Sequence, residues 1–103
     1  MKALLNSQKT AVLLKVRKGQ MILRALNHKL RQQILNIIED KPNITVTEIY
    51  NKLKIEQSVA SQHLAILRNS DIVTTTRDGK FIKYNVNQNR IKDIEAFVDQ
   101  LLK

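Results

Sequence analysis

The sequence predicts a mostly helical α+β fold, and three observations support this prediction. Residues 45–69 read as a short helix, a tight turn and a second helix, because apolar side chains recur there at helical spacing. Residues 73–86 read as two strands joined at Asp78-Gly79, a strong two-residue hairpin signal. Helical patterns also flank this region on both sides. Two helices followed by a hairpin predict a winged helix-turn-helix whose wing is the hairpin.

A single domain is expected over 1–103, because the chain holds enough apolar residues for one small core and shows no repeat or low-complexity tract. We divide it into a basic N-terminal helix or arm at 1–26, a winged-helix core at 27–86 and a C-terminal helix at 87–103. A chain of this size buries a modest share of its surface, so pairing with a second copy would stabilise it.

The stretch 2–26 is predicted to be helical, since its apolar residues form broad faces with basic residues between them. Gly19 leaves open whether this is one helix or two, because glycine weakens a helix interior. Asn27 is expected to cap the next helix, HKLRQQILNIIED. That helix stops at Lys41-Pro42-Asn43, since proline removes a backbone donor.

Ile44 is expected to begin a short strand before the helix-turn-helix. Thr45 and Glu48 match a capping box, in which each side chain bonds the other residue's backbone amide. The short helix that follows gives way to a turn at 54–56, and the second helix is predicted at 57–69.

The hairpin turn at Asp78-Gly79 sets an expected strand register. In that register Arg77 pairs with Lys80, Thr75 with Ile82 and Val73 with Tyr84. One face of the two strands is then lined by Val73, Ile82, Tyr84 and Val86.

The final helix carries apolar residues at 3-4-3 spacing, a heptad-like seam suited to a second helix. We expect this seam and the apolar face of the first helix to build a dimer. The predicted interface residues are Leu4, Leu5, Val12, Val16, Ile91, Ile94, Val98 and Leu101.

The charge of the chain predicts a polyanionic partner, since Lys and Arg number 18 against 9 Asp and Glu. The first 38 residues hold no acid, whereas the last fourteen are balanced at three basic and three acidic. There is no cysteine, which excludes disulfides and thiolate metal sites and fits a cytoplasmic protein. No apolar run reaches the roughly 18 residues of a membrane span.

On a helical wheel, Ala60, Leu64 and Leu67 of the second helix face the core, and the opposite face is polar. Small residues on that face allow close approach, glutamine can bond base edges, and the helix N-terminus offers N–H groups to phosphate. A plain solvated face is the alternative, but the wing that follows favours DNA contact. The predicted contact residues are Gln57, Ser58, Ser61 and Gln62.

The wing adds three cations, Arg77, Lys80 and Lys83. In the expected register Arg77 lies directly across from Lys80, where like charges repel, so a phosphate or minor-groove partner would explain them. Protection of an edge strand by charge is the alternative, and both roles can hold together.

No metal, cofactor or catalytic site is predicted. His28 and His63 are 35 residues apart without cysteine, which is poor ligand spacing, and His63 is expected at the border of the core or against a phosphate. Ser61, His63 and Asp71 lie on or near one short helix and point apart, so they do not suit a catalytic triad. No Gly-rich phosphate loop or metalloprotease motif occurs.

Residues 23–86 resemble the ArsR/SmtB family of bacterial winged-helix repressors. ALNHKLRQQILNII is similar to the family's first core helix, VTEIYNKL and QSVASQHLAILRNSDIV to its helix-turn-helix, and DGKFIKYNV to its wing. The most specific part is the QxxxSxHLxxL pattern from Gln57 to Leu67. The resemblance implies a homodimer built from the first and last helices, with the polar face of 57–62 in the major groove of a dyad-symmetric operator.

The positions at which this sequence departs from the family pattern indicate which kind of effector the protein would sense. The family's metal sensors commonly carry cysteine in or near the helix matching 46–53, or an Asp/His set on the last helix, and this chain has neither cysteine nor any histidine after His63. Glu56 stands in place of the usual N-capping serine, and Asp71 in place of glycine. The resemblance therefore implies DNA binding without metal sensing, with any effector unidentified.

We thus expect a DNA-binding transcriptional regulator, a dimeric repressor rather than an enzyme, that needs no cofactor and no membrane. A winged helix that docks a protein and an RNA-binding adaptor are the competing classes. Strongly salt-dependent binding to duplex DNA would distinguish a DNA-binding protein from a protein-docking module. Competition between duplex DNA and structured RNA would distinguish it from an RNA-binding adaptor.

Overall fold

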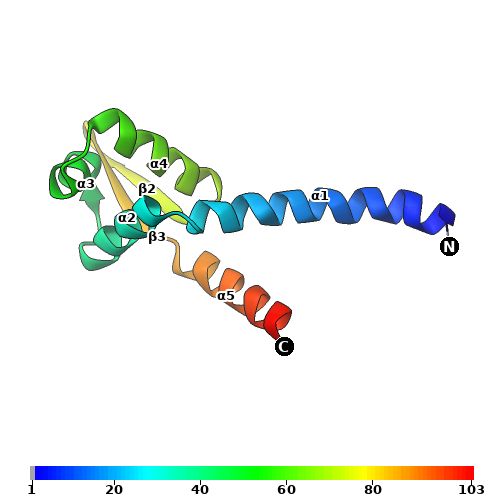
Figure 1. The fold of residues 1–103 in the computed structure, drawn as a ribbon. Helices are drawn as coiled ribbons and strands as arrows, with labels where there is room; N and C mark the ends of the chain where they lie inside the picture. The colour runs from blue at the N-terminus through cyan, green and yellow to red at the C-terminus, as the bar shows by residue number, and fades with distance from the viewer. Residues whose placement is uncertain (1) are drawn as a thin grey trace.

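The computed structural model describes residues 2–103, with side chains from Thr10 onward (Figure 1). Its order of elements confirms the predicted winged helix-turn-helix, mostly helical and of α+β class. The elements are α1 (Lys2–Leu26), α2 (Lys29–Asp40), β1 (Ile44–Thr45), α3 (Val46–Leu53), α4 (Gln57–Asn69), β2 (Val73–Asp78), β3 (Phe81–Val86) and α5 (Gln88–Leu102).

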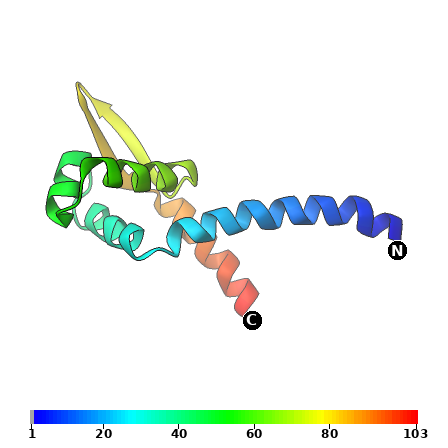
Figure 2. The ribbon, with the colours of Figure 1, turned by 45° about the horizontal axis from the view of Figure 1, so that its top comes forward.

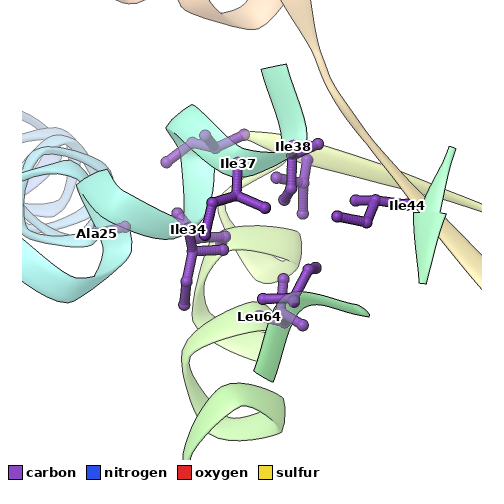
Figure 3. Close-up of a cluster of buried hydrophobic side chains, with 10 residues drawn as sticks. Ala25, Ile34, Ile37, Ile38, Ile44 and Leu64 are labelled. Atoms are coloured by element: carbon purple, nitrogen blue, oxygen red, sulfur yellow. The ribbon is translucent and has the colours of Figure 1, made fainter. Parts of the chain in front are cut away.

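The core forms where α2, α3 and α4 meet the small sheet. Branched aliphatic side chains fill it, with Ile34 and Ile38 from α2, Ile44 from β1 and Leu64 from α4 pointing toward one another (Figure 3). Such side chains have few rotamers and pack densely, so their burial is the main source of stability here. Ala60, Leu64 and Leu67 are buried, which confirms the predicted inward face of the second helix.

The three strands form an antiparallel sheet in the order β1-β3-β2. The predicted hairpin register is wrong by two residues: Asp78 pairs with Phe81, Thr75 with Tyr84 and Val73 with Val86. Gly79 and Lys80 are therefore the turn residues. Gly79 has φ of +62° while Lys80 is not among the positive-φ residues, the pattern of a type II′ turn. Because the slip is even, the predicted apolar face of the strands is unchanged.

The helix boundaries answer one question that the sequence left open and bring one correction. α1 runs through Gly19 without a break, and His28 rather than Asn27 caps α2, its Nδ1 accepting from the Leu30 amide. Asn27 instead extends the end of α1, since its amide donates to the Leu23 carbonyl. The Thr45–Glu48 capping box is confirmed.

Two helices reach out of this core. Much of α1 extends as a lone rod and α5 diverges from it, so that the molecule measures 55 × 27 × 25 Å (Figures 1 and 2). No residue of α5 is fully buried. The hairpin projects on the other side of the core, beside α4 (Figure 2).

Candidate nucleic-acid interface

The outer face of α4 is the centre of the candidate site. Gln57, Ser58, Ser61 and Gln62 are all exposed on it, while the inward side of the helix is anchored in the core. The first turn of α4 holds no acidic residue, and the side chain of Glu56 makes no capping hydrogen bond. The amides of that turn are consequently open to an external acceptor.

The turn before α4 is held in a specific backbone conformation. Lys54 adopts φ of +56° and ψ of +44°, and its amide closes the C-terminal end of α3. A left-handed lysine is uncommon, since it costs steric energy that asparagine or glycine avoids. Its exposed ammonium group stands at the entrance to α4, a position that our reasoning from sequence did not single out.

The wing places its cations differently from the prediction. Arg77 lies across from Ile82 rather than Lys80, so the expected repulsion between two opposed cations does not occur. Arg77 Nε donates to the Gly79 carbonyl at 3.3 Å, and Lys80 Nζ lies 5.5 Å from the centre of the Phe81 ring. Both side chains are exposed at the hairpin tip.

Lys83 points to the opposite face of the hairpin and forms an ion pair with Asp78, at 2.9 Å between Nζ and Oδ2. The hydrogen bond and charge of Lys83 hold the pKa of the Asp78 carboxyl below its usual value. One of the three predicted wing contacts, Lys83, is therefore engaged in an ion pair within the chain.

His63 lies on the flank of α4, half-buried, as expected from its place on the helical wheel. Its Nδ1 is 3.1 Å from Nη1 of Arg31, and its ring centre is 4.8 Å from that of His28. Burial, followed by the nearby His28 and Arg31, lowers the pKa of His63. In the part of the chain that the structure describes, no three His, Cys, Asp or Glu side chains gather as a metal site would require.

An apolar groove of about 640 Å³ separates α1 from α5. Four of the predicted interface residues line it, namely Val12, Val16, Ile94 and Leu101. Ile91 packs on the core of its own chain instead, and Val98 is half-buried outside the groove. The side chains of Leu4 and Leu5 lie outside the described ones. The other lining residues, which the predicted interface did not include, are Lys15, Gly19, Gln20, Ile22, Leu23, Arg90, Asp93 and Phe97.

No helix in the described range is both long enough and apolar enough to cross a membrane.

Known proteins share this arrangement. Residues 28–75 match the family model described as bacterial regulatory protein, arsR family. An HTH-type transcriptional regulator of Methanocaldococcus jannaschii is 31% identical over 87 residues, which cover 84% of this chain and 98% of that protein. The transcriptional repressor PagR of Bacillus anthracis is 32% identical over 73 residues, 71% of this chain and 73% of that protein.

The transcriptional activator HlyU of Vibrio cholerae is similar in both sequence and structure. It is 32% identical over 84 residues, which cover 82% of this chain and 77% of that protein. Its solved structure superposes with a TM-score of 0.65 over 86% of this chain and 97% of that one.

Proposed function

The chain belongs to the arsR family of bacterial regulatory proteins and is a DNA-binding transcriptional regulator, and we propose that it is a homodimeric repressor of a dyad-symmetric operator. In this proposal α4 of each copy enters the major groove, with Gln57, Ser58, Ser61 and Gln62 toward the bases. Arg77 and Lys80 of each wing meet the backbone or minor groove beside it, and Lys83 takes a lesser part.

The observation that carries the proposal is the exposed polar face of α4 beside a wing with two exposed cations, Arg77 and Lys80. Serine side chains are short enough to let the helix backbone approach the groove floor, and Gln62 can bond two atoms of adenine. The open amides at the start of α4 and the cations of the wing suit phosphate contacts, which set register and orientation.

The apolar groove between α1 and α5 supports the homodimer. A single copy leaves Phe97 54% and Leu101 64% exposed there, although both are large apolar side chains. A second copy of this chain would cover that face. Two α4 helices would then stand about one DNA turn apart, as an operator with two half-sites requires.

The signal of the regulator is proposed to be something other than a thiolate-bound metal, because the chain has no cysteine. PagR is named a repressor and HlyU an activator, so the sign of regulation must come from experiment. Repression by occupying a promoter is our proposal, and the cytoplasm, where the DNA lies, is the proposed place of action.

Selection of bound duplexes from random DNA tests the proposal. We expect a two-fold symmetric sequence whose half-site centres are separated by about 10 base pairs, and affinity that falls steeply as salt rises. Absence of an enriched sequence, salt-insensitive binding, or tighter binding to structured RNA than to duplex DNA would overturn it. The last two results would point to a protein-docking module and to an RNA-binding adaptor, respectively.

Two variants locate the contacts. Gln62→Ala should lose about 1–3 kcal/mol of discrimination at one base pair of each half-site. Lys80→Ala should weaken binding to all sequences alike and reduce the salt slope by about 1. Gln33→Ala on α2 and Lys92→Ala on α5 are the matched exposed controls. A uniform loss for Gln62→Ala across all operator variants would contradict its role in reading bases.

A further inference from the structure

One buried arginine holds the C-terminal end of α1. Arg31 of α2 is 9% exposed, and its guanidinium donates from Nε to the Ala25 carbonyl at 2.7 Å and from Nη2 to the Arg24 carbonyl at 2.9 Å. The last carbonyls of a helix lack partners within the helix and carry partial negative charge, so a cation there is favourable. The position of α1 relative to α2 therefore depends on this side chain.

The same guanidinium also reaches α4. Its Nη1 lies 3.1 Å from Nδ1 of His63. Because arginine only donates hydrogen bonds, His63 must accept at Nδ1 and carry its ring hydrogen on Nε2. One side chain thus connects the helix that meets DNA in the proposed function to the helix that lines the dimer groove.

No described residue near His63 carries a negative charge that would offset an added proton. The His28 ring lies tilted beside that of His63 and already uses Nδ1 to accept from the Leu30 amide, and Arg31 is the cation in contact. The chain has no acid in its first 38 residues and none in α4. Among the described residues, the groups that affect the pKa of His63 are His28 and Arg31, and none comes from α3 or β2.

We propose that Arg31 and His63 are positioning residues that fix the orientation of α4 relative to α1, and that protonation of His63 releases this link. A protonated His63 would present an N–H at Nδ1 to an N–H of Arg31, and two positive charges would face each other at hydrogen-bond distance. The two groups must then part. The expected effect on DNA binding rests on the proposed function, in which the orientation of each α4 determines whether the two helices fit the two half-sites of the operator.

The direction of the pH effect follows from the lowered pKa. Burial and the neighbouring groups lower the pKa of His63, so the link is intact above the ordinary histidine value of about 6.5 and is lost as pH falls through the lowered pKa. A simple charge effect has the opposite sign, because added positive charge tightens binding to DNA. The chain has two histidines, both in this cluster, so weaker binding in acid is a specific signature.

The first experiment measures dissociation constants by fluorescence anisotropy at pH 7.5 and 5.5 and constant ionic strength, with a labelled duplex selected at pH 7.5. We expect the natural chain to bind at least about fivefold more weakly at pH 5.5. His63→Asn places an amide oxygen near the position of Nδ1, and asparagine does not titrate. The dissociation constant of this variant at pH 5.5, divided by that at pH 7.5, should therefore be one or below. His28→Asn, a matched control that keeps a capping side chain, should retain the loss.

The second experiment measures the distance between α1 and α4 in the absence of DNA. Because the chain has no cysteine, spin labels can be placed at two exposed sites, as Arg17→Cys on α1 and Ala65→Cys on α4. Labelled chains are diluted with unlabelled ones, so that most pairs of spins lie within one copy. We expect the distance distribution to broaden or shift at pH 5.5, and His63→Asn to abolish that change.

The outcomes separate the two proposals. A pH-dependent distance without duplex binding at either pH would sink the proposed function and keep the link. Duplex binding whose pH ratio is the same in the natural chain and in His63→Asn would overturn the link and keep the function. Loss of helical circular dichroism at pH 5.5 that His63→Asn shares would also overturn the link.

Discussion

The centre of the molecule and the helices that leave it use apolar residues in opposite ways. In the winged-helix core, Ile34, Ile49 and Leu67 are completely enclosed by their own chain. Along α1 and α5, side chains of similar size remain open to water, including Val12, Val16, Phe97 and Leu101 (Figures 1 and 2). The core is therefore complete within one copy, whereas the protruding helices leave apolar surface that the proposed second copy would cover.

This difference separates two sources of stability. Burial within one chain contributes free energy at any protein concentration, whereas burial between copies depends on concentration. The hairpin tip is a third case, because it exposes charged side chains beside two apolar ones, Phe81 and Ile82. Substitutions in the three regions should consequently differ in size and in the measurement that detects them.

Leu67→Ala in the core should have the largest effect. Removing a fully enclosed leucine leaves a cavity, and we expect a loss of about 3 kcal/mol in the free energy of unfolding, measured with urea. Its neighbour on α4, Ile66, is 40% exposed, so Ile66→Ala is the matched control and should cost less than about 1 kcal/mol. Equal losses for the two variants would contradict the division between core and surface.

Sequence reasoning was most successful where one local rule decided the structure. The capping box at Thr45 and the inward face of α4 follow from spacing alone, and both are present. The predicted hairpin register was wrong because the sequence allows two alternative two-residue turns, Asp78-Gly79 and Gly79-Lys80, and both include the glycine. A type I′ turn uses Gly79 as its second residue and a type II′ turn as its first, and the chain adopts the latter pattern.

Other features could not be read from the sequence because they depend on contacts between distant residues. Asn27 is a better capping residue than His28 by type, yet α1 extends to Asn27 and leaves His28 at the cap position. Arg31 and His63 lie on different helices, 32 residues apart, and no periodicity connects them. The DNA contacts proposed for α4 and the wing remain predictions.

Phe97→Asp on α5 tests whether the protruding helices meet another copy. A charge in the middle of the apolar groove should weaken self-association by at least about thirtyfold, or about 2 kcal/mol, as seen by sedimentation equilibrium. Ala96→Asp adds the same charge at the next exposed position, outside the groove, and should change association little. A dimer of undiminished strength in Phe97→Asp would place the contact between copies elsewhere.

Gly19→Ala should separate the stability of the single chain from the strength of its self-association. A Cβ at Gly19 meets no atom within 4 Å in the single chain, so alanine should raise the free energy of unfolding of the monomer by about 1 kcal/mol. The same methyl group would project into the groove and should weaken self-association severalfold. Lys18→Ala, on an exposed position outside the groove, is the control. A less stable monomer would show that Gly19 is needed within one chain.

Asp78→Asn at the hairpin should have the smallest effect on folding. Its ion pair with Lys83 is exposed, with Asp78 72% accessible, and such pairs contribute little, so the free energy of unfolding should change by less than about 0.5 kcal/mol. DNA binding should tighten a fewfold, because the wing loses a negative charge and Lys83 becomes free to reach a phosphate. Anisotropy titrations of Asp78→Asn and of Asp99→Asn on α5 measure this difference. If both variants tighten binding equally, net charge alone is responsible and Lys83 makes no contact of its own.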